Sequence, residues 1–109
     1  MAVETGSYIE VIEVIKRYIK ELEKNNIPIQ EAILFGSYVK GDQRQESDID
    51  MALISDSFSG DWFDDRRKIV PLRRGIDNRI EPMPFRPEDF YNGGSFASEI
   101  RRTGKKIIL

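Results

Sequence analysis

Two short apolar runs, the first ending at glycine and the second opening with two aspartates, constrain this chain more than any other feature. The first run ends at Gly36-Ser37, and after ten further residues Asp48-Ile49-Asp50 opens the second. At average residue usage, four such fixed positions match by chance in roughly one chain of this length in a thousand. The pattern predicts two strands joined by a turn of helix and a polar loop, with the glycine turn near both carboxylates.

Hydrophobic periodicity and turn residues predict the remaining elements of a single domain over residues 1–109. The expected helices cover 7–25, 37–40, 61–74, a short segment from 87, and 95–103, and the expected strands cover 31–35, 48–55, 79–85 and 105–109, with a polar loop at 41–47. This order of elements favours an α/β or α+β architecture, in which helices flank a small mixed sheet.

Particular residues indicate where these elements begin, bend and lie. Ser7 and Glu10 form a capping-box pattern, which predicts that the first helix begins at Ser7. Pro71 is expected to kink or end the helix at 61–74, because proline removes a backbone donor. Pro82 and Pro84 favour the edge of the sheet for the strand at 79–85.

The absence of two residue types narrows the chemistry. The chain has no cysteine and no histidine, which excludes thiolate zinc sites, cysteine nucleophiles and serine–histidine catalysis. Any metal must therefore be held by oxygen atoms, which favours Mg2+, Mn2+ or Ca2+. The P-loop pattern and the further ligands of an EF-hand are also absent.

Carboxylates gather at the expected start of the second strand. Side chains alternate along a strand, so Asp48 and Asp50 are predicted to share one face, where their repulsion is tolerable beside a divalent cation. Glu81 on the third strand is the candidate for a third carboxylate, either a general base or a shared ligand. Asp77 is a rival, although Asp77-Asn78 is typical of a turn. The alternative for each is an ordinary surface carboxylate.

The Gly36-Ser37 turn is suited to a phosphate group. Glycine allows close approach of a ligand to the backbone, and the free amides at the start of a helix favour an anion. The Ser37 hydroxyl would add a further donor. The alternative is an ordinary turn between a strand and a helix.

These residues together resemble the nucleotidyltransferase superfamily related to DNA polymerase beta, and within it the minimal nucleotidyltransferases. The resemblance rests on Gly36, Ser37, Lys40, Gly41, Ser47, Asp48, Asp50 and Glu81. It implies two Mg2+ ions, with Mn2+ as a substitute, held by Asp48, Asp50 and Glu81 as the metal-binding and catalytic residues. It also implies nucleotide binding by Gly36, Ser37, Lys40 and Ser47, although Lys40 can equally be a surface lysine.

The resemblance implies two functions that can both hold. The first is Mg2+-dependent transfer of a nucleoside monophosphate, AMP from ATP being favoured, to a hydroxyl acceptor. The second is an antitoxin-like module that neutralises an all-helical HEPN-type partner, which can itself be the acceptor. A fragment of a larger transferase is the third alternative, against which the capping box at Ser7 and the strand at 105–109 favour a self-contained domain.

The surface and the cellular location carry weaker signals. A net charge of -2 gives no general attraction to nucleic acid, and the basic cluster within 66–74 is expected to be a solvated helix face. Trp62 and Phe63 are expected in the core or on a partner-facing patch. No apolar run approaches the ~20 residues that span a bilayer and no secretory signal precedes the first helix, so we expect a cytoplasmic protein. An oligomer is compatible with the sequence.

Overall fold

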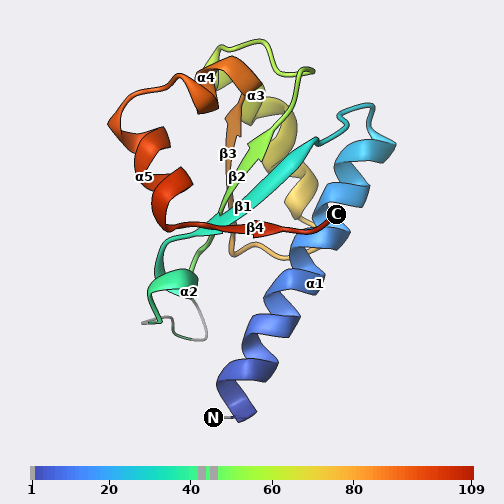
Figure 1. The fold of residues 1–109 in the computed structure, drawn as a ribbon. Helices are drawn as coiled ribbons and strands as arrows, with labels where there is room; N and C mark the ends of the chain where they lie inside the picture. Colours follow the sequence, from blue (N-terminus) through green and yellow to red (C-terminus); the bar gives the residue numbers. More distant parts are fainter. Residues whose placement is uncertain (1, 42–43, 45–46) are drawn as a thin grey trace.

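A four-stranded sheet forms the centre of the computed structural model, which describes residues 2–41, 44 and 47–109, with side chains from residue 8 onward. The strands are β1 (Glu31–Phe35), β2 (Ile49–Ile54), β3 (Ile80–Phe85) and β4 (Lys105–Ile107). They lie in the order β3-β2-β1-β4 (Figure 1). β1 pairs antiparallel with β2 and β4, whereas β2 and β3 are parallel. The predicted mixed sheet is therefore confirmed.

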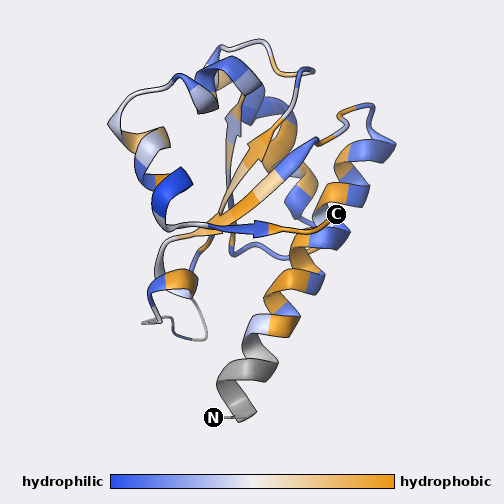
Figure 2. Ribbon diagram, viewed as in Figure 1, coloured by the Kyte–Doolittle hydropathy of each residue, from blue (hydrophilic) through white to orange (hydrophobic). Residues whose placement is uncertain are grey.

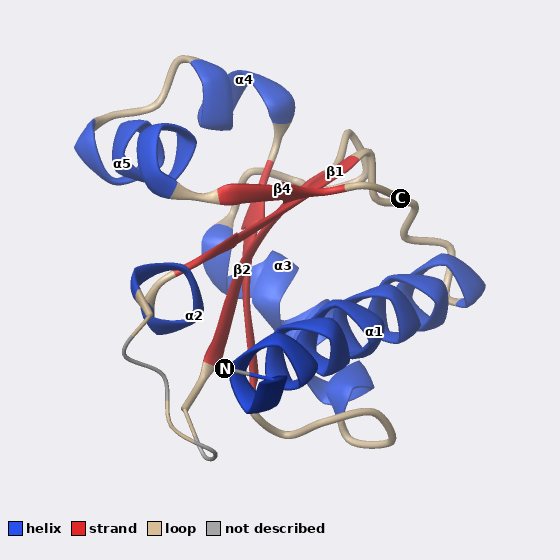
Figure 3. Ribbon diagram, turned by 60° about the horizontal axis from the view of Figure 1, so that its bottom comes forward, coloured by secondary structure: helices blue, strands red, loops and turns tan. Residues whose placement is uncertain are grey.

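Helices cover both faces of this sheet. They are α1 (Ala2–Lys24), α2 (Ser37–Lys40), α3 (Trp62–Ile69), the 3-10 helix η1 (Val70–Arg73), α4 (Pro87–Tyr91) and α5 (Ser95–Thr103). Figure 3 shows α1 and α3 on one side of the sheet, and α4 and α5 on the other. This is the flanked sheet that the order of elements predicted.

Alternation along the strands supplies a separate core to each face. Leu34 and Met51 pack in the larger core beneath α1 and α3, whereas their neighbours Ile33 and Ala52 pack in the smaller core beneath α4 and α5. Apolar and polar residues recur along the ribbon of α1, and the central strands β1 and β2 are mostly hydrophobic, apart from Glu31 and Asp50 (Figure 2). β1 and β2 are therefore held in register, because a slip of one residue would exchange the two faces.

Proline fixes the place of β3 in the sheet. The backbone N–H of Ile49 donates to the carbonyl of Arg79, and that of Ser55, just after β2, donates to the carbonyl of Phe85. The backbone polar groups of the odd-numbered residues of β3 therefore point towards β2. Pro82 and Pro84 are even-numbered, and their nitrogens lie on the outer edge, where no donor is needed. The edge position expected from these prolines is confirmed.

The first helix begins earlier than the sequence predicted. α1 begins at Ala2, so Ser7 lies inside the helix and does not cap it. Once the apolar stripe from Val11 to Leu22 packs on the sheet, extension by further residues adds one hydrogen bond each at little cost. The capping box therefore gives no support to a self-contained domain. Of the loop expected at 41–47, residues 42–43 and 45–46 lie outside the described part of the chain.

The helix expected at 61–74 is divided in the way that Pro71 predicts. α3 ends at Ile69, and the chain continues as η1 with Pro71 near its start. The Asp61 carboxylate caps α3 by accepting from the backbone N–H of Asp64 at 3.1 Å. None of the helices in the described ranges has the length and hydropathy required to cross a membrane.

A buried hydroxyl connects α1 to the end of α3. The Tyr18 hydroxyl donates to the backbone carbonyl of Ile69 at 2.6 Å, and both residues are fully buried. We expect Tyr18→Phe to lower the free energy of unfolding by about 1–2 kcal/mol, because it leaves that carbonyl without this donor. Urea unfolding followed by circular dichroism measures the change.

Tyr91 provides the control for this prediction. Its hydroxyl donates to Glu31 on the exposed surface, where water can replace it. Tyr91→Phe should change the free energy of unfolding by less than about 0.5 kcal/mol. Equal effects of the two substitutions would contradict the structural role of Tyr18.

Candidate active site

Strand pairing brings the glycine turn and the three candidate carboxylates to one end of the sheet. Phe35 at the end of β1 pairs with Asp50 near the start of β2, so Gly36 follows directly beside the aspartates. Asp50 also pairs with Glu81 across the parallel β2–β3 ladder. Paired residues of neighbouring strands have side chains on the same face, so Asp50 lies between the turn and Glu81.

Gly36 is required at its position for two reasons. Its φ of 79° and ψ of -148° lie in a region that is strained for any side chain. A Cβ at Gly36 would lie 2.3 Å from Oδ2 of Asp50 and 3.2 Å from its Cγ. The Asp50 carboxylate therefore occupies the space that a side chain at residue 36 would need, and the turn and the carboxylate fit as one unit.

Negative charge accumulates around Asp50. Burial raises the pKa of Asp50 to about 6, and the neighbouring carboxylates Asp48 and Glu81 contribute in the same direction. Asp48 itself is exposed, just before the first residue of β2, and Asp50 is half-buried. A half-buried carboxylate that is disfavoured by two like charges is suited by its donor chemistry to a divalent cation.

Glu81 meets arginines at the edge of this site. Its Oε1 lies 3.2 Å from Nη2 of Arg66 and 3.6 Å from Nη1 of Arg73. Within the described residues, no group of three or more acidic side chains lies close enough together to hold a metal ion. The predicted triad is thus placed on adjacent strands at one end of the sheet, but Glu81 is held by guanidinium groups.

The candidate nucleotide-binding residues surround the turn. Ser37 is the partly exposed first residue of α2, and Lys40 is its exposed last residue, followed by Gly41 in the left-handed conformation. Ser47 shapes the loop before the aspartates, because its Oγ accepts from the backbone N–H of Arg44 at 2.6 Å. Their contact with a nucleotide stays a prediction.

The basic cluster differs from the expectation of a wholly solvated helix face. Arg67 is exposed and pairs with Asp64 one turn away, as expected. Arg66 and Arg73, however, are partly buried, with side-chain exposures of 23% and 27%. Their spacing of seven residues, two turns of helix, places them on one face and was the available sequence signal. The residue they meet is distant in sequence, so the spacing alone did not identify it.

Two further expectations have clear outcomes. Asp77 has the turn role that was expected, because its carboxylate accepts from the backbone and side chain of Arg79, and these bonds lower its pKa. Trp62 and Phe63 are not core residues, since they are 43% and 73% exposed. Of the two interpretations given for these aromatic residues, only the surface patch agrees with the structure.

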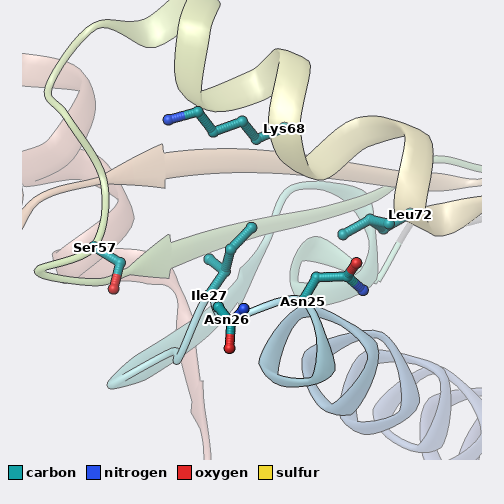
Figure 4. Close-up of a pocket in the computed structure, with 6 residues that line it drawn as sticks. All are labelled: Asn25, Asn26, Ile27, Ser57, Lys68 and Leu72. Carbon is teal, nitrogen blue, oxygen red and sulfur yellow. The ribbon is translucent and has the colours of Figure 1, made fainter.

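A cavity of about 390 Å3 lies away from the carboxylates, near the end of α1. It is lined by Asn25, Asn26, Ile27, Ser57, Lys68 and Leu72 (Figure 4). β2 ends at Ile54, and Ser57 of the cavity lies shortly after that end. Asp48 lies directly before the first residue of β2, so the cavity and the carboxylates are at opposite ends of this strand. The cavity is therefore not part of the candidate active site.

The charge around Asp50 predicts a pH-dependent stability. Because the folded-state pKa of Asp50 is about 6, above its ordinary value of 3.8, its contribution to stability falls as pH rises between these values. Asp50→Asn should therefore raise the free energy of unfolding at pH 7.5 by about 1–2 kcal/mol, after allowance for solvent screening at a half-buried position. The gain should vanish near pH 4. Urea unfolding across this pH range measures it.

Asp56→Asn is the matched control, because Asp56 is exposed beyond the other end of β2. It should leave the free energy of unfolding almost unchanged at each pH. A gain from Asp50→Asn that stayed constant between pH 4 and pH 7.5 would contradict the raised pKa.

A family model covers the part of the chain that contains this candidate site. The family model described as "Polymerase beta, Nucleotidyltransferase" matches residues 17–108, which include the turn and all three carboxylates. A 42-residue segment is 40% identical to the "putative protein adenylyltransferase" of Methanocaldococcus jannaschii, over 38% of this chain and 48% of that protein. The chain thus aligns with about half the length of this relative.

Solved structures share the fold. A "putative nucleotidyltransferase" from Sulfolobus solfataricus superposes with a TM-score of 0.63 at 20% identity, over 83% of this chain and 79% of that one. A toxin–antitoxin complex with AMP-PNP gives 0.58 at 24% identity, over 84% and 71%. A mutant of the toxin–antitoxin pair MntA–HpeT gives 0.58 at 22%, over 85% and 71%. The match over 17–108 and the shared fold show that this chain belongs to the polymerase beta nucleotidyltransferase family.

Proposed function

We propose that this chain transfers a nucleoside monophosphate, AMP from ATP, to a hydroxyl group on a partner protein in the cytoplasm. The observation that carries the proposal is the fit of Asp50 against Gly36, with Asp48 and Glu81 beside it. A phosphate-sized turn next to clustered carboxylates is the arrangement that a metal-dependent phosphoryl transfer needs. Membership of the nucleotidyltransferase family supports this class of reaction.

The three carboxylates are the residues that would hold the metal. Asp48, Asp50 and Glu81 offer oxygen ligands, and the chain has no histidine or cysteine to compete with them. Two Mg2+ ions, or Mn2+ in their place, would supply charge neutralisation at the triphosphate and at the attacking oxygen. The raised pKa of Asp50 supports the proposal, because a cation would relieve the repulsion that contributes to it.

The remaining steps belong to the chain's own residues. Gly36 leaves room for a phosphate to approach the backbone, and the Ser37 hydroxyl would donate to a phosphate oxygen. The acceptor oxygen forms a bond to the α-phosphorus while the bond to pyrophosphate breaks. Glu81 would take the proton that the acceptor hydroxyl loses. Lys40 is exposed beside the turn and is suited to the leaving pyrophosphate.

A partner protein is the acceptor that the similar proteins favour. The cavity at the far end of β2 is remote from the carboxylates and is not proposed to hold an acceptor. The named activity of the Methanocaldococcus relative is adenylyl transfer to protein, and two structural neighbours are toxin–antitoxin complexes, one with AMP-PNP. These likenesses support a toxin-like partner, for which we propose the HEPN type.

A second candidate function is neutralisation of that partner by binding alone. It is favoured by the ion pairs of Glu81, which turn the third carboxylate towards Arg66 and Arg73. The MntA–HpeT neighbour is a mutant in which two aspartates separated by one residue are replaced by glutamates.

The test of the first function is transfer of labelled nucleotide from ATP to candidate partner proteins, beginning with the product of a neighbouring gene. We expect label on the partner with Mg2+ and wild-type protein, and a loss of at least about 100-fold with Asp50→Ala. Asp56→Ala, a change at an exposed aspartate remote from the site, should transfer normally. Phosphor imaging and mass spectrometry measure the product. Equal labelling by wild type and Asp50→Ala would overturn the proposed activity.

Survival of cells separates the two functions. If transfer neutralises the partner, Asp48→Ala should fail to rescue cells that express it, although the two proteins still copurify. Full rescue by Asp48→Ala would show that binding alone is sufficient.

A further inference from the structure

Two arginines hold the carboxylate that the proposed reaction needs. Arg66 donates from Nη2 to Oε1 of Glu81 at 3.2 Å, and Nη1 of Arg73 lies 3.6 Å from the same oxygen. The three side chains are only 23–30% exposed. An ion pair at this depth is screened less by solvent than a surface pair, so the attraction between its charges is stronger.

Each arginine is also fixed by a second contact. The Arg66 guanidinium lies over the ring of Trp62, with 4.9 Å between Cζ and the ring centroid. Arg73 donates from Nη1 to the backbone carbonyl of Ile80 at 2.7 Å, directly before Glu81. The arginines are thus held at the outer edge of β3 independently of Glu81. The two guanidinium groups therefore present positive charge to Glu81 from fixed positions.

We propose that Arg66 and Arg73 form a latch on Glu81 that competes with the divalent cation, so that the third carboxylate joins the site only when the cation displaces the guanidinium groups. The inference rests on the proposed function, since it concerns the same three carboxylates. The physical reason is that Arg66 hydrogen-bonds Oε1 and Arg73 lies 3.6 Å from it, so a cation that approaches this carboxylate meets two positive charges that repel it. Arg66 and Arg73 are then positioning residues that act through Glu81.

The latch has a consequence for its neighbours. When Glu81 turns to the cation, Arg66 loses its carboxylate partner but keeps the ring of Trp62. Trp62 is the only tryptophan of the chain. Its fluorescence therefore reports the environment of Arg66 without any need for catalysis.

Binding of Mn2+ measures the competition directly. Free Mn2+ is followed by electron paramagnetic resonance while the wild-type protein, Arg66→Gln and Arg67→Gln are titrated. Arg66→Gln should bind Mn2+ about five- to twentyfold more tightly than wild type, because a charge-assisted hydrogen bond no longer opposes the cation. Arg67→Gln removes the same charge from the next residue, which is exposed and bound to Asp64, and should change the affinity less than about twofold.

A double-substitution cycle shows whether the effect passes through Glu81. In a Glu81→Gln background, Arg66→Gln should no longer tighten Mn2+ binding. A persistent gain there, or an equal gain in Arg67→Gln, would show a general charge effect and overturn the latch. Circular dichroism and urea unfolding of each variant establish that it is folded. Arg66→Lys keeps the charge but loses the planar guanidinium group, so its Mn2+ affinity should lie between those of wild type and Arg66→Gln.

Fluorescence of Trp62 gives a second readout. Saturating Mg2+ should change its emission in the wild-type protein and leave it unchanged in Glu81→Gln. A wild-type emission that stays constant with Mg2+ would show that Arg66 does not respond to the cation, against the proposal. Both readouts are independent of nucleotide transfer, so the latch can fail while transfer is observed, and transfer can fail while the latch holds.

Discussion

The double pairing of β2 is the constraint on which the rest of the molecule depends. β2 is antiparallel to β1 on one side and parallel to β3 on the other, so its first residues meet the end of β1 and the start of β3 together. Asp50 thereby lies between Gly36 and Glu81, in a space that only glycine leaves open. Three segments far apart in sequence are brought to one point by backbone hydrogen bonds, before any ligand contributes.

This convergence places negatively charged carboxylates close together, and the fold offsets their repulsion only in part. Asp50 is raised in pKa by burial and by its two acidic neighbours, whereas Glu81 is offset by Arg66 and Arg73. The two carboxylates thus differ: the surroundings of Asp50 disfavour its negative charge, whereas Glu81 forms ion pairs with two arginines. The electrostatic cost at this candidate site is offset elsewhere, here by two apolar cores on opposite faces of the sheet.

Features set by neighbouring residues could be predicted from the sequence, whereas side-chain contacts between separate elements could not. β1 and α2 have the predicted bounds because an apolar run, a glycine and a helical turn follow one another within ten residues. The edge position of β3 followed from two prolines. The start of α1 was wrong, since a capping pattern at Ser7 did not outweigh continuation of a packed helix. The arginine contacts of Glu81 join residues 15 and eight positions apart across an irregular connection, and no periodicity encodes that geometry.

The prolines of β3 also restrict how another protein can attach. A strand can be added to a sheet only where the edge offers free backbone donors, and Pro82 and Pro84 remove them from the β3 edge. The opposite edge is the three-residue β4, with exposed Lys105 and Lys106, a charged and short template of the kind that discourages strand addition. Association by extension of the sheet is thus disfavoured at both of its borders. A partner is left to recognise helices and loops by their side chains, which confers selectivity and protects the sheet from growing into aggregates.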